Sequence, residues 1–201
     1  IFDLDNTILK LDSDYEMVNY LIDKNLILEK YRKINEDYFK SYENGSININ
    51  NFSEFSLKPF VGKTQNDINF ILDDFYYKII KPAYNFNIIK RINEHKKSNQ
   101  KILLASATNS LIVLYIADKL GFKDVISSRV IFKNGRCTGK IKLPYALGDG
   151  KLELVKEYCR DFNFCLDNAC FYSDSNNDLP LLEAVNMPIA VNPDKDLKKF
   201  A

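Results

Sequence analysis

The chain has 201 residues, 46% of them hydrophobic, and a formal net charge of +1 at pH 7. This length suits one domain, or a core with a small inserted domain. The balanced charge gives no reason to expect nucleic acid or an acidic membrane surface as a partner. No apolar run is long enough to span a bilayer, and we expect no membrane as a partner. The four cysteines form no Cys-x-x-Cys pair and indicate reduced thiols of a cytoplasmic protein.

In chain order, the first two residues predict a buried strand that ends at Phe2, directly before Asp3 and Asp5. Because the sequence begins inside this strand and without a methionine, we expect native residues ahead of Ile1 to be missing. The sequence leaves open whether these residues included a targeting segment that is removed. Apolar residues at helical spacing then predict helices over 13–44, with a second run from about 28, and over 64–79 and 82–97. Residues 46–62 predict a loop with a short helix.

From residue 101 onward, short apolar runs alternate with helical stretches. The runs predict strands over 101–105, 125–126, 170–172 and 188–191, and an Asn-Gly pair predicts the turn of a hairpin over 130–141. Helices are predicted up to Gly121, over 151–162 and 178–185, and from 194 onward. This alternation predicts an α/β fold with a doubly wound, Rossmann-like parallel sheet. Residues 1–12 and 98–201 would form its core, and 13–97 an inserted all-helical cap.

Polar groups follow the predicted strands or open the helices that face them. Asp3 and Asp5 lie two residues apart in an extended segment, so their carboxylates project to one side and need a cation or a proton between them. In an open α/β sheet, the carboxyl ends of the strands are where ligands bind. The groups expected there are Asp3, Asp5, Ser106, Lys151, Asp174 and Asp178. Carboxylates, a lysine and a hydroxyl in one crevice suit a phosphate group together with magnesium.

These motifs resemble, in order, the four motifs of the haloacid dehalogenase (HAD) superfamily of phosphatases, in the branch (subfamily IB) close to phosphoserine phosphatase. Asp3-Leu4-Asp5-Asn6-Thr7 resembles the first motif, Ser106 the second and Lys151 the third. The stretch from Tyr172 to Asp178 resembles the fourth. The match extends over the whole chain, and it implies a Rossmann-like core with an inserted helical C1 cap.

The resemblance also implies a role for each motif residue. Asp3 would be the nucleophile of an aspartyl-phosphate intermediate, and Asp5 would protonate the leaving alcohol and then activate water. Mg²⁺ would bind to the side chains of Asp3 and Asp174 and to the main-chain carbonyl of Asp5. Asp178 would orient Lys151 or metal-bound water. The phosphoryl group would be held by Ser106, Ala107, Lys151 and Asn177.

Substrate choice is expected to lie in the cap. Phosphoserine phosphatases, which this chain resembles, use a cap arginine for the substrate carboxylate, but the only arginine between residues 13 and 82 is Arg32, away from the expected mouth. Lys58 is the expected substitute. Asp12 and Asp14 place two carboxyl groups at the entrance. Asp12 lies where phosphoserine phosphatases carry the glutamate that binds the amine of the substrate. We expect a small phosphorylated metabolite with an amino group, and phosphoserine and histidinol phosphate both fit.

Two other functional classes remain open from the sequence. A non-enzymatic phospho-acceptor signalling domain also carries acids, a hydroxyl and a lysine, but it needs no helical insert and no Asp5. An inactive phosphate-binding module is the other alternative. His95, the only histidine, is predicted to be solvated near a helix end, and the cysteines are predicted to be reduced thiols. The oligomeric state is not predicted.

Overall fold

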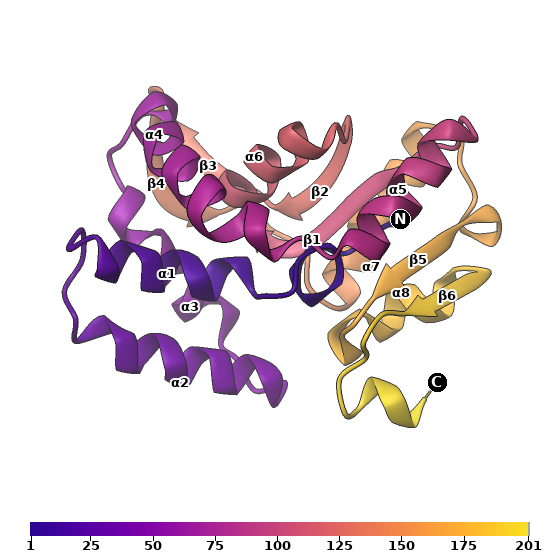
Figure 1. Ribbon diagram of the computed structural model, residues 1–201, viewed down its shortest axis with the longest axis horizontal. Coiled ribbons are helices and arrows are strands. Elements are labelled where there is room, and N and C mark those ends of the chain that lie inside the picture. The colour runs from indigo at the N-terminus through magenta and orange to yellow at the C-terminus, as the bar shows by residue number, and fades with distance from the viewer. Residues whose placement is uncertain (201) are drawn as a thin grey trace.

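The computed structural model describes residues 1–200 and has the predicted α/β architecture (Figure 1). Phe2 pairs in parallel with Leu104 on one side and with Tyr172 on the other, so the first residues form the central strand of the sheet. The other parallel strands are β1 (Leu103–Asn109), β2 (Asp124–Ser128), β5 (Cys170–Ser173) and β6 (Met187–Ala190). The order across the sheet is therefore β2, β1, the first residues, β5 and β6.

The sheet separates two hydrophobic cores, as a doubly wound fold requires. Phe2, Leu104 and Tyr172 belong to one core, whereas Leu103 and Phe171 belong to the other. Successive strand residues point to opposite faces, so neighbours such as Leu103 and Leu104 divide between the two cores. The helices that cover the faces are α5 (Phe86–Lys97), α6 (Ser110–Leu120), α7 (Asp149–Asp161) and α8 (Leu179–Ala184).

The predicted helical insert follows the central strand. Its helices are α1 (Ser13–Asp23), α2 (Tyr31–Glu43), α3 (Ile49–Leu57) and α4 (Gln65–Phe75), followed by α5. The short helix predicted within residues 46–62 is α3, which begins where the Asn48 side chain accepts a hydrogen bond from the Asn51 amide. Helices α1 and α2 pack side by side, to the left of the sheet in Figure 1.

The two connections between the insert and the sheet run together. Leu9 pairs antiparallel with Tyr84, and the Lys10 amide donates to the Ala83 carbonyl at 2.8 Å. Beyond them, α5 packs on the sheet, where the His95 ring lies 5.7 Å from that of Phe2. The predicted boundary at residue 97 is not tested by these contacts and stays a prediction.

His95 is half-buried, and the prediction that it is solvated is wrong. Its Nε2 lies 3.0 Å from the Tyr172 hydroxyl, and the two rings meet edge to face. The packing of α5 on the sheet explains the difference, because it turns the last turn of this helix toward the first strand. The single histidine is thus used in packing on the face of the sheet.

The hairpin predicted around the Asn-Gly turn is confirmed as β3 (Val130–Lys133) and β4 (Arg136–Ile141). Asn134 and Gly135 both have positive φ, as a two-residue hairpin turn requires. The hairpin also pairs with the insert, because the Cys137 amide donates to the Lys63 carbonyl and the Gly62 amide donates to the Cys137 carbonyl, both at 2.9 Å.

Other details of the predictions are settled by the structure. β1 continues to Asn109, beyond the expected end at Ala105, and the terminal helix is only a short 3₁₀ turn over Leu197–Lys199. All four cysteines are free thiols. None of the helices within residues 1–200 combines the length and the apolar composition that a bilayer crossing requires.

Candidate active site

The first motif turns sharply where the central strand ends. The Asp3 amide donates to the Tyr172 carbonyl at 2.9 Å, so Asp3 still belongs to the sheet, and its side chain is buried. Asn6 then adopts φ 53°, a left-handed conformation that asparagine tolerates better than most residues. The Leu9 amide closes the turn by donating to the Leu4 carbonyl. The turn leaves Asp3 and Asp5 beside the same pocket at the carboxyl edge of the sheet.

Asp5 is held by groups from both the insert and β1. One carboxylate oxygen accepts from the Ser13 amide at 2.7 Å, and the other accepts from the Thr108 hydroxyl at 2.7 Å. The Ser106 hydroxyl lies farther from it, at 3.5 Å. Burial raises the pKa of Asp5, and the hydrogen bonds from Ser13 and Thr108 partly offset this effect. Asp5 is therefore fixed in place and favours its protonated form more than an exposed aspartate does.

Lys151 is buried between two carboxylates. Its Nζ lies 3.0 Å from Asp3 and 2.6 Å from Asp178, and the three side chains are 2%, 9% and 3% exposed. The Ser173 hydroxyl donates to the second oxygen of Asp178 at 2.7 Å. Burial lowers the pKa of Lys151, but the two carboxylates outweigh burial and raise it, so the ammonium stays charged. This triad connects the first motif to the third and the fourth.

Asp174 faces the first motif from the end of β5, where it accepts from the Thr7 hydroxyl at 3.2 Å. Burial and repulsion by Asp178 and Asp5 raise its pKa to about 7. Burial also raises the pKa of Asp3, against the attraction of Lys151 and with repulsion from Asp178 and Asp174. The carboxylates around Asp3 therefore outnumber the one ammonium beside them.

This excess of negative charge, offered entirely by oxygen atoms, fits a hard divalent cation such as Mg²⁺. Within residues 1–200, no group of three or more His, Cys, Asp or Glu side chains has the arrangement of a metal site. The predicted ligand set does not need one, because it uses only the carboxylates of Asp3 and Asp174 with the main-chain carbonyl of Asp5. The chemistry of these groups is thus compatible with magnesium.

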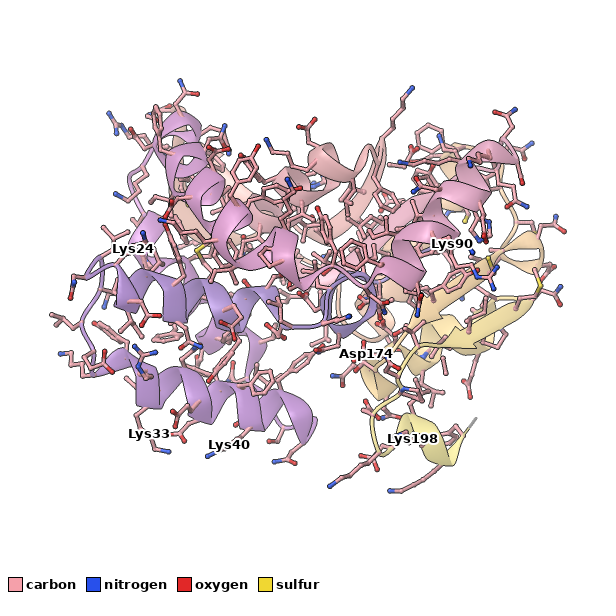
Figure 2. The ribbon with its side chains drawn as sticks, viewed as in Figure 1. Lys24, Lys33, Lys40, Lys90, Asp174 and Lys198 are labelled. Atoms are coloured by element: carbon pink, nitrogen blue, oxygen red, sulfur yellow. The ribbon has the colours of Figure 1, made fainter. Side chains whose placement is uncertain are left out.

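The structure brings the predicted residues of all four motifs together. Ser106 is fully buried and its hydroxyl accepts from the Thr108 amide at 3.2 Å, while Ala107 lines the pocket directly. Asn177 lies on the 3₁₀ turn after β5 (Asn176–Asp178), close to the Tyr42 side chain of α2. In Figure 2, Asp174 lies where the lobe of β5 and β6 meets the inserted helices.

Two of the three predicted specificity residues lie in this pocket. Asp12 lines it and also begins α1, since its side chain accepts from the Tyr15 amide at 2.8 Å. Asp14 accepts from Asn109 at 2.6 Å, and burial together with repulsion by Asp5 raises the Asp14 pKa to about 7. Lys58 is exposed and lines a separate hollow with Val18 and neighbouring residues, so the structure does not bring it to the site.

The wall contributed by the insert is aromatic. Tyr38, Phe39 and Tyr42 follow helical spacing on one face of α2, and the pocket is also lined by Tyr15, Asn35 and Phe52. On the outer side of α2, Lys33 and Lys40 point away from Asp174 (Figure 2). The sequence analysis missed these aromatic residues, because stripes of apolar residues on a helix usually indicate packing.

Thr108 is a second residue that the sequence analysis missed. It is 4% exposed and makes the short hydrogen bond to Asp5 described above. Its position two residues after Ser106 in a strand places both side chains on one side, which is the signal that could have identified it.

Comparison with known proteins decides the family. The chain matches the family model of the haloacid dehalogenase-like hydrolases over residues 1–183. The chain belongs to this family. It is 32% identical to a histidinol-phosphatase of Neisseria meningitidis. The alignment covers the whole chain and 93% of that relative. The chain is 26% identical to a phosphoserine phosphatase of Saccharomyces cerevisiae, again over the whole chain but over 61% of that protein.

Solved structures agree with this fold. The crystal structure of a Bordetella pertussis protein of unknown function superposes on this chain with a TM-score of 0.91 and is 30% identical to it in sequence. The superposition covers the whole of this chain and 92% of the Bordetella chain. A substrate-bound phosphoserine phosphatase superposes with a TM-score of 0.73 at 17% identity, over the whole chain and 88% of the other, which is a likeness of fold. The protein is therefore an HAD-type phosphatase of the phosphoserine phosphatase-like branch, and the signalling-domain alternative is set aside.

Proposed function

We propose that this phosphatase hydrolyses a small aminated phosphomonoester with the aid of Mg²⁺, and that histidinol phosphate fits its site better than phosphoserine. The observation that carries the choice is the composition of the pocket wall. Within the described residues, the pocket is lined by the carboxyl groups of Asp12, directly before the insert, and of Asp14 within it, together with aromatic rings of the insert. No lysine or arginine among the described residues of the insert lines it.

The first chemical step is transfer of the phosphoryl group to Asp3. A carboxylate oxygen of Asp3 attacks phosphorus, and the bond from phosphorus to the substrate's alcohol oxygen breaks. Asp5 gives its proton to that oxygen, a role that suits its raised pKa and its fixed orientation. In the second step, Asp5 takes a proton from water, which attacks phosphorus and releases inorganic phosphate and free Asp3.

The phosphoryl oxygens need donors in this site. Lys151 holds its ammonium 3.0 Å from Asp3, the Ser106 hydroxyl lies 3.5 Å from Asp5, and Ala107 lines the pocket. These groups and Asn177 are the proposed donors to the phosphoryl oxygens. Mg²⁺, held by Asp3, Asp174 and the Asp5 carbonyl, would neutralise charge on the transferring group. Asp178 keeps Lys151 in place from behind.

The residues of the pocket wall favour a substrate with an amino group over one with a carboxylate. Burial raises the pKa of Asp12 and of Asp14, and an ammonium group near them favours their ionised forms and gains attraction from both. The carboxylate of phosphoserine would meet two acidic groups without a cation from the insert. Aromatic faces suit the ring of histidinol phosphate. The similarity to a protein named histidinol-phosphatase, over the full chain, supports the same choice.

Steady-state hydrolysis tests the proposal. Histidinol phosphate, phosphoserine and p-nitrophenyl phosphate are compared in Mg²⁺ buffer, with Asp3→Asn as the inactive control. We expect kcat/KM for histidinol phosphate to exceed that for phosphoserine by at least about tenfold, since an unpaired buried charge is rejected strongly. A preference for phosphoserine would contradict the proposed substrate, and activity in Asp3→Asn equal to the wild type would contradict the mechanism.

A further inference from the structure

Asn35 on α2 is a buried residue of the pocket lining that carries a hydrogen-bond acceptor without a partner. The residue is 1% exposed and is part of the pocket lining. Its Nδ2 donates to the Tyr15 carbonyl at 3.0 Å and lies 3.3 Å from the side-chain oxygen of Asn19. Its Oδ1 is buried and has no hydrogen-bond partner within the described part of the chain. Buried polar groups are nearly always paired, so this oxygen calls for a partner.

The orientation of the amide follows from its neighbours. The Tyr15 carbonyl can only accept hydrogen bonds, so the NH₂ group of Asn35 must face it. Exchanging the two ends of the amide would bring two acceptors together and would also lose the contact with Asn19. The unpaired end of the amide is therefore an oxygen, and its partner must be a donor such as N–H or O–H.

The position of Asn35 places this acceptor at the far end of the pocket from the phosphoryl site. Tyr42 lies in the last turn of α2, and this end of the helix is the one nearer to Asp174, as a comparison of Lys40 with Lys33 in Figure 2 shows. Asn35 lies two turns earlier on the same face of α2, which is about 10 Å along the helix axis. The rings of Tyr38 and Phe39 lie between the two ends.

From this geometry we propose that Asn35 is a specificity-determining residue whose Oδ1 accepts a hydrogen bond from a ring N–H of the substrate. The inference rests on the proposed function and narrows its substrate class. The substrate carries a planar ring with an N–H donor, such as an imidazole, joined through a short amino-bearing chain to the phosphomonoester. The aromatic side chains of α2 contact the ring faces, and Asn35 reads the donor on the ring edge. A substrate with a carboxylate at this end of the pocket would not bind well, because both its carboxylate and the Asn35 Oδ1 only accept hydrogen bonds.

A comparison of two substrates on matched variants tests the role of Asn35. Histidinol phosphate is compared with its thiophene analogue, in which the same amino alcohol phosphate carries a ring without N–H. We expect the wild type to prefer the imidazole in kcat/KM by about 10- to 100-fold, and we expect the ratio of kcat/KM between the two substrates to fall to near one in Asn35→Leu. Asn19→Leu, which removes a neighbour of Asn35 outside the pocket, should retain the preference.

The outcomes separate the possible failures. Equal wild-type rates on the two substrates would overturn the inference without any variant, and so would Asn35→Leu that keeps the preference. If Asn35→Leu does not fold, Asn35→Ser is used, because it also removes the amide oxygen but keeps a small polar side chain beside the Tyr15 carbonyl; it should lose the preference too. If the wild type hydrolyses p-nitrophenyl phosphate but neither aminated substrate, the proposed function fails instead.

Discussion

Replacing Asp14 by asparagine should make the protein more stable at alkaline pH, although it removes a charge from the pocket. Asp14 is 8% exposed, and burial with repulsion from Asp5 raises its pKa to about 7, against the hydrogen bond from Asn109. In the unfolded chain its pKa returns to near 4. The folded state thus favours the protonated acid. Its contribution to stability is complete below about pH 4 and is lost as the pH rises through about 7.

The size of the effect follows from the two pKa values. Each unit of difference corresponds to about 1.4 kcal/mol, so ionising Asp14 in the folded protein costs up to about 4 kcal/mol at pH 8. Between pH 5 and pH 8 the cost grows by about 2–3 kcal/mol. Asparagine carries no such cost, and its side-chain oxygen can still accept the hydrogen bond from Asn109. The free energy of unfolding of Asp14→Asn should therefore gain on that of the wild type as the pH rises.

Urea unfolding followed by circular dichroism, at pH 5, 6, 7 and 8 with EDTA present, measures this gain. Asp37→Asn is the matched control, because Asp37 is exposed on α2 and its pair with Lys33 at 2.9 Å is a surface ion pair. The control should change stability by less than about 0.5 kcal/mol at every pH. If the gap between Asp14→Asn and the wild type stays constant from pH 5 to pH 8, or narrows, burial does not raise the pKa of Asp14 and the reasoning is refuted.

Two further predictions concern the charged centre. Lys151→Met leaves the buried carboxylates of Asp3 and Asp178 without their cation, so unfolding in urea should become easier by about 3–5 kcal/mol at pH 8; adding Asp178→Asn should recover part of this loss, and no recovery would speak against the triad. Removal of divalent cations with EDTA should abolish hydrolysis of p-nitrophenyl phosphate, and added Mg²⁺ should restore it; full activity in EDTA would rule out the proposed metal.

The carboxyl edge of the sheet was predictable because its chemistry is encoded in short local patterns. Asp3 and Asp5 follow an apolar pair, and Asp174 follows another strand, so their meeting depends only on the parallel sheet. The hairpin was equally local, since Asn134-Gly135 specifies its turn. The roles assigned to these residues remain proposals, but their placement in one site is what the motifs predict.

The pocket wall was not predictable in the same way. Tyr38 and Phe39 have the spacing of an ordinary buried helix face, and only the tertiary structure turns that face toward the motifs. The position of Lys58 depended on the direction of a short helix in a stretch that predicted mostly loop, and the structure places it on another surface. His95 was misjudged for a related reason, since the packing of α5 on the sheet leaves no local signal.

The aromatic wall on α2 has a consequence for how such an enzyme changes over generations. Asn35 is the only buried residue of α2 within the described side chains, and neither hydrophobic core, as described, draws on that helix. Substitutions at Tyr38, Phe39 or Tyr42 therefore leave the two hydrophobic cores almost untouched. Natural or laboratory evolution can therefore change the alcohol part of the phosphomonoester that the pocket accepts, while the motif residues at the carboxyl edge of the sheet stay the same.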